Sequence, residues 1–167
     1  TQNQSSAASD VYKRQIFDIR DVPRWLRDAV LDADVLGVDF EWPEYRPISL
    51  VQIAIQSPYE LVLLMTVRYP CALPVFIRAL FTNPNKVKAL GGHIMSGRAP
   101  DARKLTATFG IEYDELQGFT GLGDMALRRG LPGKGLRNIA AYFGWHIRKD
   151  RDVTVSNWKR PLDDDQI

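Results

Sequence analysis

Hydrophobic residues in the first half of the chain gather in three short runs that alternate with polar segments. The runs are rich in β-branched and aliphatic residues, and the segments between them, PEYRP and QSPY, are rich in turn-forming residues. Connections this short join neighbouring antiparallel strands, because a parallel crossover needs about a dozen residues or more. The pattern therefore predicts a three-stranded antiparallel meander in residues 35–42 (VLGVDFEW), 48–55 (ISLVQIAI) and 60–67 (ELVLLMTV).

Other segments have the spacing of amphipathic helices. Pro23 and Pro74 are each well placed to open a helix, and apolar residues around Pro74 recur at i, i+3, i+4, i+7 and i+8. Two further strands are expected at 16–20 (IFDIR) and 86–90 (KVKAL). Helices are expected in residues 21–33, 74–81, about 100–109, about 120–129 and 133–144. This order of strands and helices predicts a mixed α/β domain.

The helix expected at 133–144 (GKGLRNIAAYFG) has an apolar face and a defined end. Gly144 is expected to stop it, since glycine is the commonest residue just past a helix. The residues that share the apolar face are Leu136, Ile139, Ala140 and Phe143. We expect this face to be buried.

Composition narrows the class of protein. The chain has 167 residues, of which 45% are hydrophobic, and this suits one globular domain with a sizeable core. Cys71 is the single cysteine, so a disulfide framework is excluded and an intracellular location, in the nucleus or cytoplasm, is expected. No apolar run approaches the roughly 18 residues that span a bilayer, so no membrane partner is expected.

The first fifteen residues, TQNQSSAASDVYKRQ, are polar and lack periodicity. This composition predicts a disordered tail over residues 1–15, and part of it resembles a translated cDNA-library adaptor. The expected domain is therefore 16–167. Because the chain begins with Thr1 and stops at Ile167 without a closing element, we expect it to be a fragment.

Asp39 and Glu41 interrupt the first run of the meander. Side chains alternate along a strand, so these two carboxylates project from one face while Leu36, Val38 and Phe40 take the other. Neighbouring carboxylates repel, and a divalent cation between them would remove that cost because hard cations prefer oxygen ligands. An isolated Asp-x-Glu is more often a pair of solvated acids at an exposed strand end.

The order of segments along the chain identifies a resemblance. VDFEW is followed by LVQIAI, by VLLM, by KVKALGGHIMSGRAPDARKLTATFGI and by SNWKRPLDDDQI. From Ile16 to Ile167 this series resembles the ribonuclease-H-like 3'-5' exonucleases with four catalytic acids, the DEDD superfamily, and within it the Werner-syndrome-exonuclease-like branch. The resemblance implies a mixed sheet of three antiparallel strands plus a parallel strand, flanked by helices.

The resemblance also implies a two-metal site. Asp39 and Glu41 in VDFEW match the first motif, and Asp101 in PDARKL matches the second. These residues would be the catalytic acids and would bind two Mg²⁺ or Mn²⁺ ions that hydrolyse phosphodiester bonds from a single-stranded 3' end, in DNA or RNA. Cys71, His93 and His146 are too far apart in sequence to suggest a zinc site instead.

Two departures from the family pattern bear on this assignment. The segment GGHIMSGRAPD is longer than the short glycine turn that family members often have, so Asp101 is open to a second interpretation as an acid in the first turn of a helix opened by Pro100. SNWKRPLDDDQI matches only the approach to the third motif, and the chain ends before the positions of that motif's tyrosine and fourth aspartate. We therefore expect residues 1–167 alone to be nearly inactive.

Nucleic-acid contact is also expected from charge. Residues 128–160 contain nine Lys or Arg against two acids, and the candidates for phosphate contact are Arg148, Lys149, Lys159 and Arg160. A solvated basic face is the alternative. Trp42 could stack on a terminal base or simply pack, and Gln52 is a candidate for substrate contact from the next strand.

Three functions follow from these observations. The favoured one is a metal-dependent 3'-5' exonuclease. The alternatives are a catalytically inactive member of the same fold that binds nucleic acid or protein, and a ribonuclease-H-like endonuclease or transposase-like nuclease. The oligomeric state does not follow from the sequence.

Overall fold

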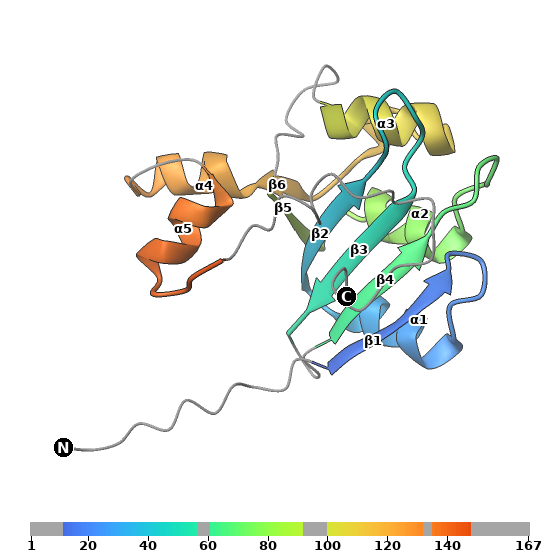
Figure 1. The fold of residues 1–167 in the computed structure, drawn as a ribbon, viewed down its shortest axis with the longest axis horizontal. Coiled ribbons are helices and arrows are strands. Elements are labelled where there is room, and N and C mark those ends of the chain that lie inside the picture. Colours follow the sequence, from blue (N-terminus) through green and yellow to red (C-terminus); the bar gives the residue numbers. More distant parts are fainter. Residues whose placement is uncertain (1–11, 57–60, 92–99, 132–134, 148–167) are drawn as a thin grey trace.

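The computed structural model describes residues 12–56, 61–91, 100–131 and 135–147, and Figure 1 shows a twisted sheet with helices packed around it. Six strands form the sheet in the order β1-β4-β3-β2-β5-β6. The strands are β1 (Tyr12–Asp18), β2 (Val35–Glu41), β3 (Leu50–Ile55), β4 (Leu61–Thr66), β5 (Val87–Leu90) and β6 (Phe119–Gly121). The predicted meander β2-β3-β4 is antiparallel, while β1 pairs with β4, and β5 with β2 and β6, in parallel. The expected α/β class and mixed sheet are confirmed.

Two strands differ from the expectation. β1 begins at Tyr12, where it pairs with Leu61 of β4, so it reaches into residues that we had assigned to a tail. The edge of β4 offers backbone partners over this whole length, and such pairing does not depend on side-chain periodicity. β6 occupies the start of the helix that we expected from Thr120, because its three residues pair with β5. A strand of three residues is too short to show an alternation.

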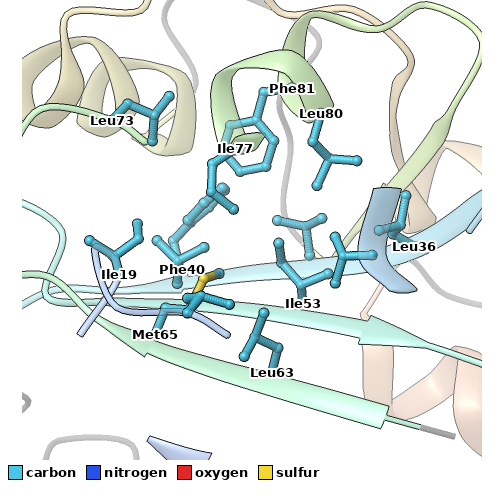
Figure 2. Packing of buried hydrophobic residues seen from close by; sticks show 14 of the residues in the cluster. Ile19, Leu36, Phe40, Ile53, Leu63, Met65, Leu73, Ile77, Leu80 and Phe81 are labelled. Atoms are coloured by element: carbon cyan, nitrogen blue, oxygen red, sulfur yellow. The ribbon is translucent and has the colours of Figure 1, made fainter. Parts of the chain in front are cut away.

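The core lies between the sheet and two helices, α1 (Arg24–Asp32) and α2 (Val75–Thr82). Figure 2 shows side chains of the central strands facing those of α2. Phe40 of β2 meets Phe81 of α2 edge to face, with ring centroids 5.9 Å apart. Such aromatic pairs add to the free energy gained by burial alone. The predicted apolar face of β2 is therefore the face that anchors the strand.

The remaining helices follow the sheet in sequence. They are α3 (Pro100–Phe109), the short 3₁₀ helix η1 (Tyr113–Glu115), α4 (Leu122–Arg128) and α5 (Leu136–Tyr142). Helix α3 buries Ala102, Leu105 and Phe109. Over the described residues no helix is both long and apolar enough to cross a membrane.

Helix α5 differs from the expectation in its burial. Gly144 adopts a φ of 80° just after the helix and so ends it as predicted. The apolar face, however, is not buried: Leu136 is 45% exposed and Phe143 is 64% exposed. In Figure 1, α5 lies beside α4 and apart from the face of the sheet that α1 and α2 cover. An amphipathic pattern indicates which side of a helix is apolar, but it does not specify what covers that side.

A fully buried lysine joins the end of α2 to strand β5. The Lys88 ammonium on β5 donates hydrogen bonds to the carbonyl oxygens of Leu80, at 3.1 Å, and Asn83, at 2.6 Å. It also lies 5.4 Å from the centre of the Phe119 ring on β6. Burial, followed by the nearby charge of Lys86, lowers the pKa of Lys88 to about 8. Lys88 thus donates to two carbonyl groups at the end of α2, where the last carbonyl groups of a helix lack their usual partners, and the Leu80 carbonyl oxygen also accepts the Asn83 amide at 3.4 Å.

Candidate active site

Asp39 and Glu41 lie on the face of β2 opposite the core. Along this strand Leu36, Val38 and Phe40 are buried, whereas Asp39 is exposed and Glu41 is half-buried. The alternation of the strand therefore places both carboxylates on one face, at the end of the strand where the chain leaves the sheet. This confirms the predicted assignment of faces.

Strand β3 supplies the neighbours of the two acids. Gln52 is paired with Asp39 and Leu50 with Glu41 in the antiparallel register. Directly opposed residues in such a pair have Cβ atoms about 4.5–5.5 Å apart and share a face. Gln52 is half-buried and Leu50 is buried. The amide group of Gln52 therefore lies opposite the exposed Asp39, and the apolar side chain of Leu50 lies opposite the half-buried Glu41.

The chain returns from β2 to β3 through the loop of residues 42–49. The Ser49 amide donates to the carbonyl oxygen of Glu41 at 2.9 Å, and this bond draws the start of β3 to the end of β2. Tyr45 lies at the tip of the loop with a φ of 57°, in the left-handed region that non-glycine residues seldom adopt. Its side chain is 90% exposed.

Helix α3 is fastened to this loop by two side chains. The backbone amide of Ile48 donates to the Thr108 hydroxyl oxygen at 2.9 Å in a buried hydrogen bond. The Lys104 ammonium donates to the carbonyl oxygen of Arg46 and lies 5.6 Å from the centre of the Trp42 ring. Trp42 is half-buried and packs against the core, so packing, one of the two expected roles of this residue, is confirmed.

Asp101 is in the first turn of α3 and is half-buried. Its position in the first turn also agrees with the interpretation that an acid there complements the helix dipole. Asp39, Glu41 and Asp101 each have an interaction partner within the fold. Within the described residues, no three or more His, Cys, Asp or Glu side chains form a group that could hold a metal ion.

The donor chemistry of Asp39 and Glu41 fits a hard cation, since both offer carboxylate oxygens from a rigid strand. The third predicted ligand is not grouped with them. Asp101 follows residues 92–99, which lie outside the described residues and make up most of the segment GGHIMSGRAPD that left its alignment open. The part of the chain that the structure describes therefore contains the pair Asp39 and Glu41 on one face of β2 without the expected group of three acids.

The predicted phosphate contacts fall outside the described residues. They are Arg148, Lys149, Lys159 and Arg160. Three other arginines of the basic segment, Arg128, Arg129 and Arg137, are described and exposed. Exposed arginines of this kind are compatible with a phosphate-binding surface and equally with a solvated one.

Sequence reasoning missed Lys104 and Thr108. Both follow Asp101 on one face of α3, at i+3 and i+7. This shared face was the sign in the sequence that the two side chains could contact one segment. A lysine in the middle of a helix carries no indication of its partner, however, because the loop that it contacts is almost sixty residues away in sequence. Their role depends on tertiary structure.

No protein-family model and no curated protein matches this sequence. Solved structures do resemble it. Escherichia coli RNase D, an exoribonuclease involved in structured RNA processing, matches 92% of this chain with 19% identity and a TM-score of 0.66. Brucella melitensis NrnC matches 92% of this chain and 71% of its own length, with 17% identity and a TM-score of 0.69.

A third structure is the EXD2 exonuclease domain soaked in Mn and dGMP, which has 25% identity and a TM-score of 0.50. The match covers 91% of this chain and 80% of that domain. By contrast, the chain spans only 39% of the length of RNase D. Its α/β sheet with flanking helices has the ribonuclease-H-like fold of the RNase D and EXD2 exonuclease structures.

Proposed function

We propose that this protein is a metal-dependent 3'-5' exonuclease that hydrolyses phosphodiester bonds from the free 3' end of single-stranded DNA or RNA. The observation that carries the proposal is the position of Asp39 and Glu41 on one face, at the end of β2, in a sheet of exonuclease-like fold. The EXD2 exonuclease domain soaked in Mn and dGMP supports a divalent-metal requirement and a nucleotide ligand.

Asp39, Glu41 and Asp101 would hold two divalent ions, Mg²⁺ or Mn²⁺. When bound, such ions activate a water molecule and offset the charge that develops on the phosphate. The protein groups would hold the substrate in place. The Gln52 amide, opposite Asp39, can donate a hydrogen bond to a phosphate or sugar oxygen, and Leu50 offers an apolar surface beside Glu41.

Substrate binding is proposed to extend to basic and aromatic residues. Arg148, Lys149, Lys159 and Arg160 would neutralise phosphates, and this part of the proposal rests on the charge balance of residues 128–160. Trp42 would stack on a terminal base with the side of its ring that Lys104 does not cover. Binding would then weaken steeply as salt is added.

The motif order supports a finer assignment to the Werner-syndrome-exonuclease-like branch. VDFEW, PDARKL and SNWKRPL follow one another in the sequence as they do in that branch. The single Cys71 supports an intracellular location, in the nucleus or cytoplasm. The test of the branch is substrate preference, namely DNA against RNA of the same sequence.

The proposal is tested with the full-length protein and a single-stranded oligonucleotide labelled at its 5' end. With Mg²⁺ or Mn²⁺ we expect a ladder of products shortened from the 3' end, and no products in EDTA. A substrate with a blocked 3' end and a circular substrate serve as controls, and both should stay intact. Cleavage of the circular substrate would indicate an endonuclease and contradict the proposal.

A second candidate is a member of the same fold that binds nucleic acid without cleaving it. The observation that favours it is the lack of a three-acid group among the described residues. The same assay separates the two functions, because a binding protein would shift the labelled oligonucleotide in a gel and leave its length unchanged at every metal concentration.

A further inference from the structure

Helix α5 begins at the same edge of the sheet as the one where Asp39 lies. Strands β2 and β5 are parallel, and Val38 of β2 is paired with Leu90 of β5, so the residues that follow them, Asp39 and Gly91, lie at one edge. A Cβ atom added at Gly91 would lie 3.9 Å from Cδ2 of Leu136, the first residue of α5. Because adjacent strands are only about 4.8 Å apart, the start of α5 lies close to the end of β2.

Aromatic side chains are exposed at the other end of α5. The exposed ring of Phe143 meets that of Tyr142 edge to face, with ring centroids 5.3 Å apart, and Trp145 is 73% exposed. Single exposed apolar residues are ordinary, but a group of them marks an interaction site. Exposed aromatic rings are also the means by which proteins bind single-stranded nucleic acid, because every base has a face on which a ring can stack.

The backbone holds Trp145 in place although its side chain is in solvent. The Gly144 amide donates to the carbonyl oxygen of Ala141 at 3.0 Å, and the Trp145 amide donates to that of Ala140 at 2.9 Å. These two hydrogen bonds form a Schellman motif, which closes the end of the helix. A ligand that stacks on Trp145 would therefore meet a backbone that is already ordered, and this lowers the entropic cost of binding.

The charges of this part of the molecule favour a polyanion. Residues 122–147 contain four Lys or Arg and one acid, Asp124. Arg137 on α5 is exposed, as are Arg128 and Arg129 at the end of α4, which contacts α5. A second copy of this chain is a poorer occupant, because a two-fold interface places the same surface against itself and would bring these arginines together.

We propose that α5 and the turn after it bind the unpaired bases of single-stranded nucleic acid on the rings of Phe143 and Trp145, while Arg137 contacts its phosphates. The inference rests on the part of the proposed function in which the substrate is a single strand, and it involves no metal ion. Since α5 starts close to the end of β2, a strand bound along α5 would extend toward the candidate active site.

Two pairs of variants separate stacking from charge. Phe143→Leu combined with Trp145→Leu keeps apolar side chains and removes both aromatic faces. Trp25→Leu is the matched control, since Trp25 is 53% exposed on α1, which covers the core face of the sheet and lies apart from α5 (Figure 1). Arg137→Gln removes a charge from α5, and Arg24→Gln removes one from the first turn of α1.

The experiment measures the dissociation constants of the full-length protein, in EDTA, for a labelled single strand, for a strand of the same length without bases, and for a blunt duplex. We expect the double variant to bind the single strand at least about fivefold more weakly than Trp25→Leu does. Its affinity for the other two ligands should be unchanged, because the one has no bases and those of the other are stacked in the duplex. Arg137→Gln should bind all three more weakly than Arg24→Gln does, with a smaller dependence on salt.

Three results would overturn the inference. The first is equal affinity of the double variant and Trp25→Leu for the single strand. The second is an equal loss of affinity for all three ligands, which would mean that the rings serve the fold and not the bases. The third is a dimer in sedimentation that the double variant loses while its affinity for the single strand is unchanged, which would make this surface an interface between copies.

Failure of the inference and failure of the proposed function are distinguishable, because binding in EDTA does not require a metal site. Binding that depends on the two rings, without hydrolysis in Mg²⁺, would contradict the proposed function and support the inference. Hydrolysis from the 3' end, with binding that does not depend on the rings, would overturn the inference and leave the proposed function intact.

Discussion

Gln52 lies directly opposite Asp39 in the antiparallel pairing of β3 with β2. The two residues share a face of the sheet, so an uncharged hydrogen-bond donor stands beside an exposed carboxylate at the end of the central meander. Unlike the ammonium group of a lysine, the neutral amide does not compete with a metal cation for the carboxylate. It can therefore contact a ligand without opposing a metal.

The first prediction concerns this amide. Gln52→Leu keeps the approximate size of the side chain but removes its donor, and we expect kcat/KM for an oligonucleotide to fall about tenfold. Mn²⁺ affinity should stay unchanged, because Gln52 is not among the proposed ligands. Gln56→Leu is the matched control, since Gln56 is exposed just beyond the other end of β3. Equal kcat/KM values for the two variants would exclude a substrate contact by Gln52.

The second prediction concerns the packing of β6 against α2 and β5. Gly118 has a φ of 68°, and a Cβ atom there would lie 2.2 Å from the carbonyl oxygen of Lys86. Gly110 has a φ of 62° and no atom within 4 Å of its Cβ position. Gly110→Ala should therefore cost only the backbone strain of about 1–2 kcal/mol, whereas Gly118→Ala should cost clearly more.

The difference between the two glycine variants isolates the steric clash, because both glycines have a similar positive φ. Urea denaturation measures the free energy of unfolding of each. If Gly118→Ala were no less stable than Gly110→Ala, the close approach of Gly118 to Lys86 in the fold would be wrong.

The third prediction is a pH dependence of stability from Lys88. Its pKa is lowered from 10.5 to about 8 in the folded protein, mainly by burial. Between these two values the unfolded chain binds more protons than the folded protein does, so the free energy of unfolding rises as the pH increases through this window. Lys88→Met lacks this titration and removes the side-chain donor to the carbonyl oxygens of Leu80 and Asn83.

We therefore expect the stability advantage of the wild type over Lys88→Met to grow from pH 8 to pH 10.5. The comparison of the two proteins cancels the other groups that titrate in this range. Urea denaturation at both ends of the window measures the advantage. An advantage that stays constant or shrinks with rising pH would mean that Lys88 is not buried as a lysine of lowered pKa.

Those parts of the fold that depend on local pattern were predictable from the sequence. The alternation of Leu36, Val38 and Phe40 with Asp39 and Glu41 assigned both faces of β2 correctly, because a strand that is half-buried must alternate. The short turns between strands likewise identified the meander, since they leave no room for a crossover.

What could not be predicted depends on contacts between distant segments. Phe119 and Thr120 join the sheet through pairing with β5, and the segment of three residues is too short to show the alternation that predicts a strand. Lys88 lies at an alternating strand position, as a surface lysine would, yet it is buried because its ammonium donates to the carbonyl oxygens of Leu80 and Asn83 at the end of α2. The contact between Lys104 and Trp42 is of the same kind. Asp101 was correctly assigned to the first turn of a helix, and its assignment to the group of metal ligands stays a prediction.

The central claim is that Asp39 serves hydrolysis through metal binding and is not needed to hold the nucleic acid. The most direct test is Asp39→Asn in the full-length protein, a replacement that keeps the shape of an exposed side chain and removes its charge. We expect hydrolysis of a single-stranded oligonucleotide in Mg²⁺ to fall by about a thousandfold or more, with the dissociation constant for the same oligonucleotide changed less than about threefold. Hydrolysis at the wild-type rate in Asp39→Asn would contradict the proposed mechanism.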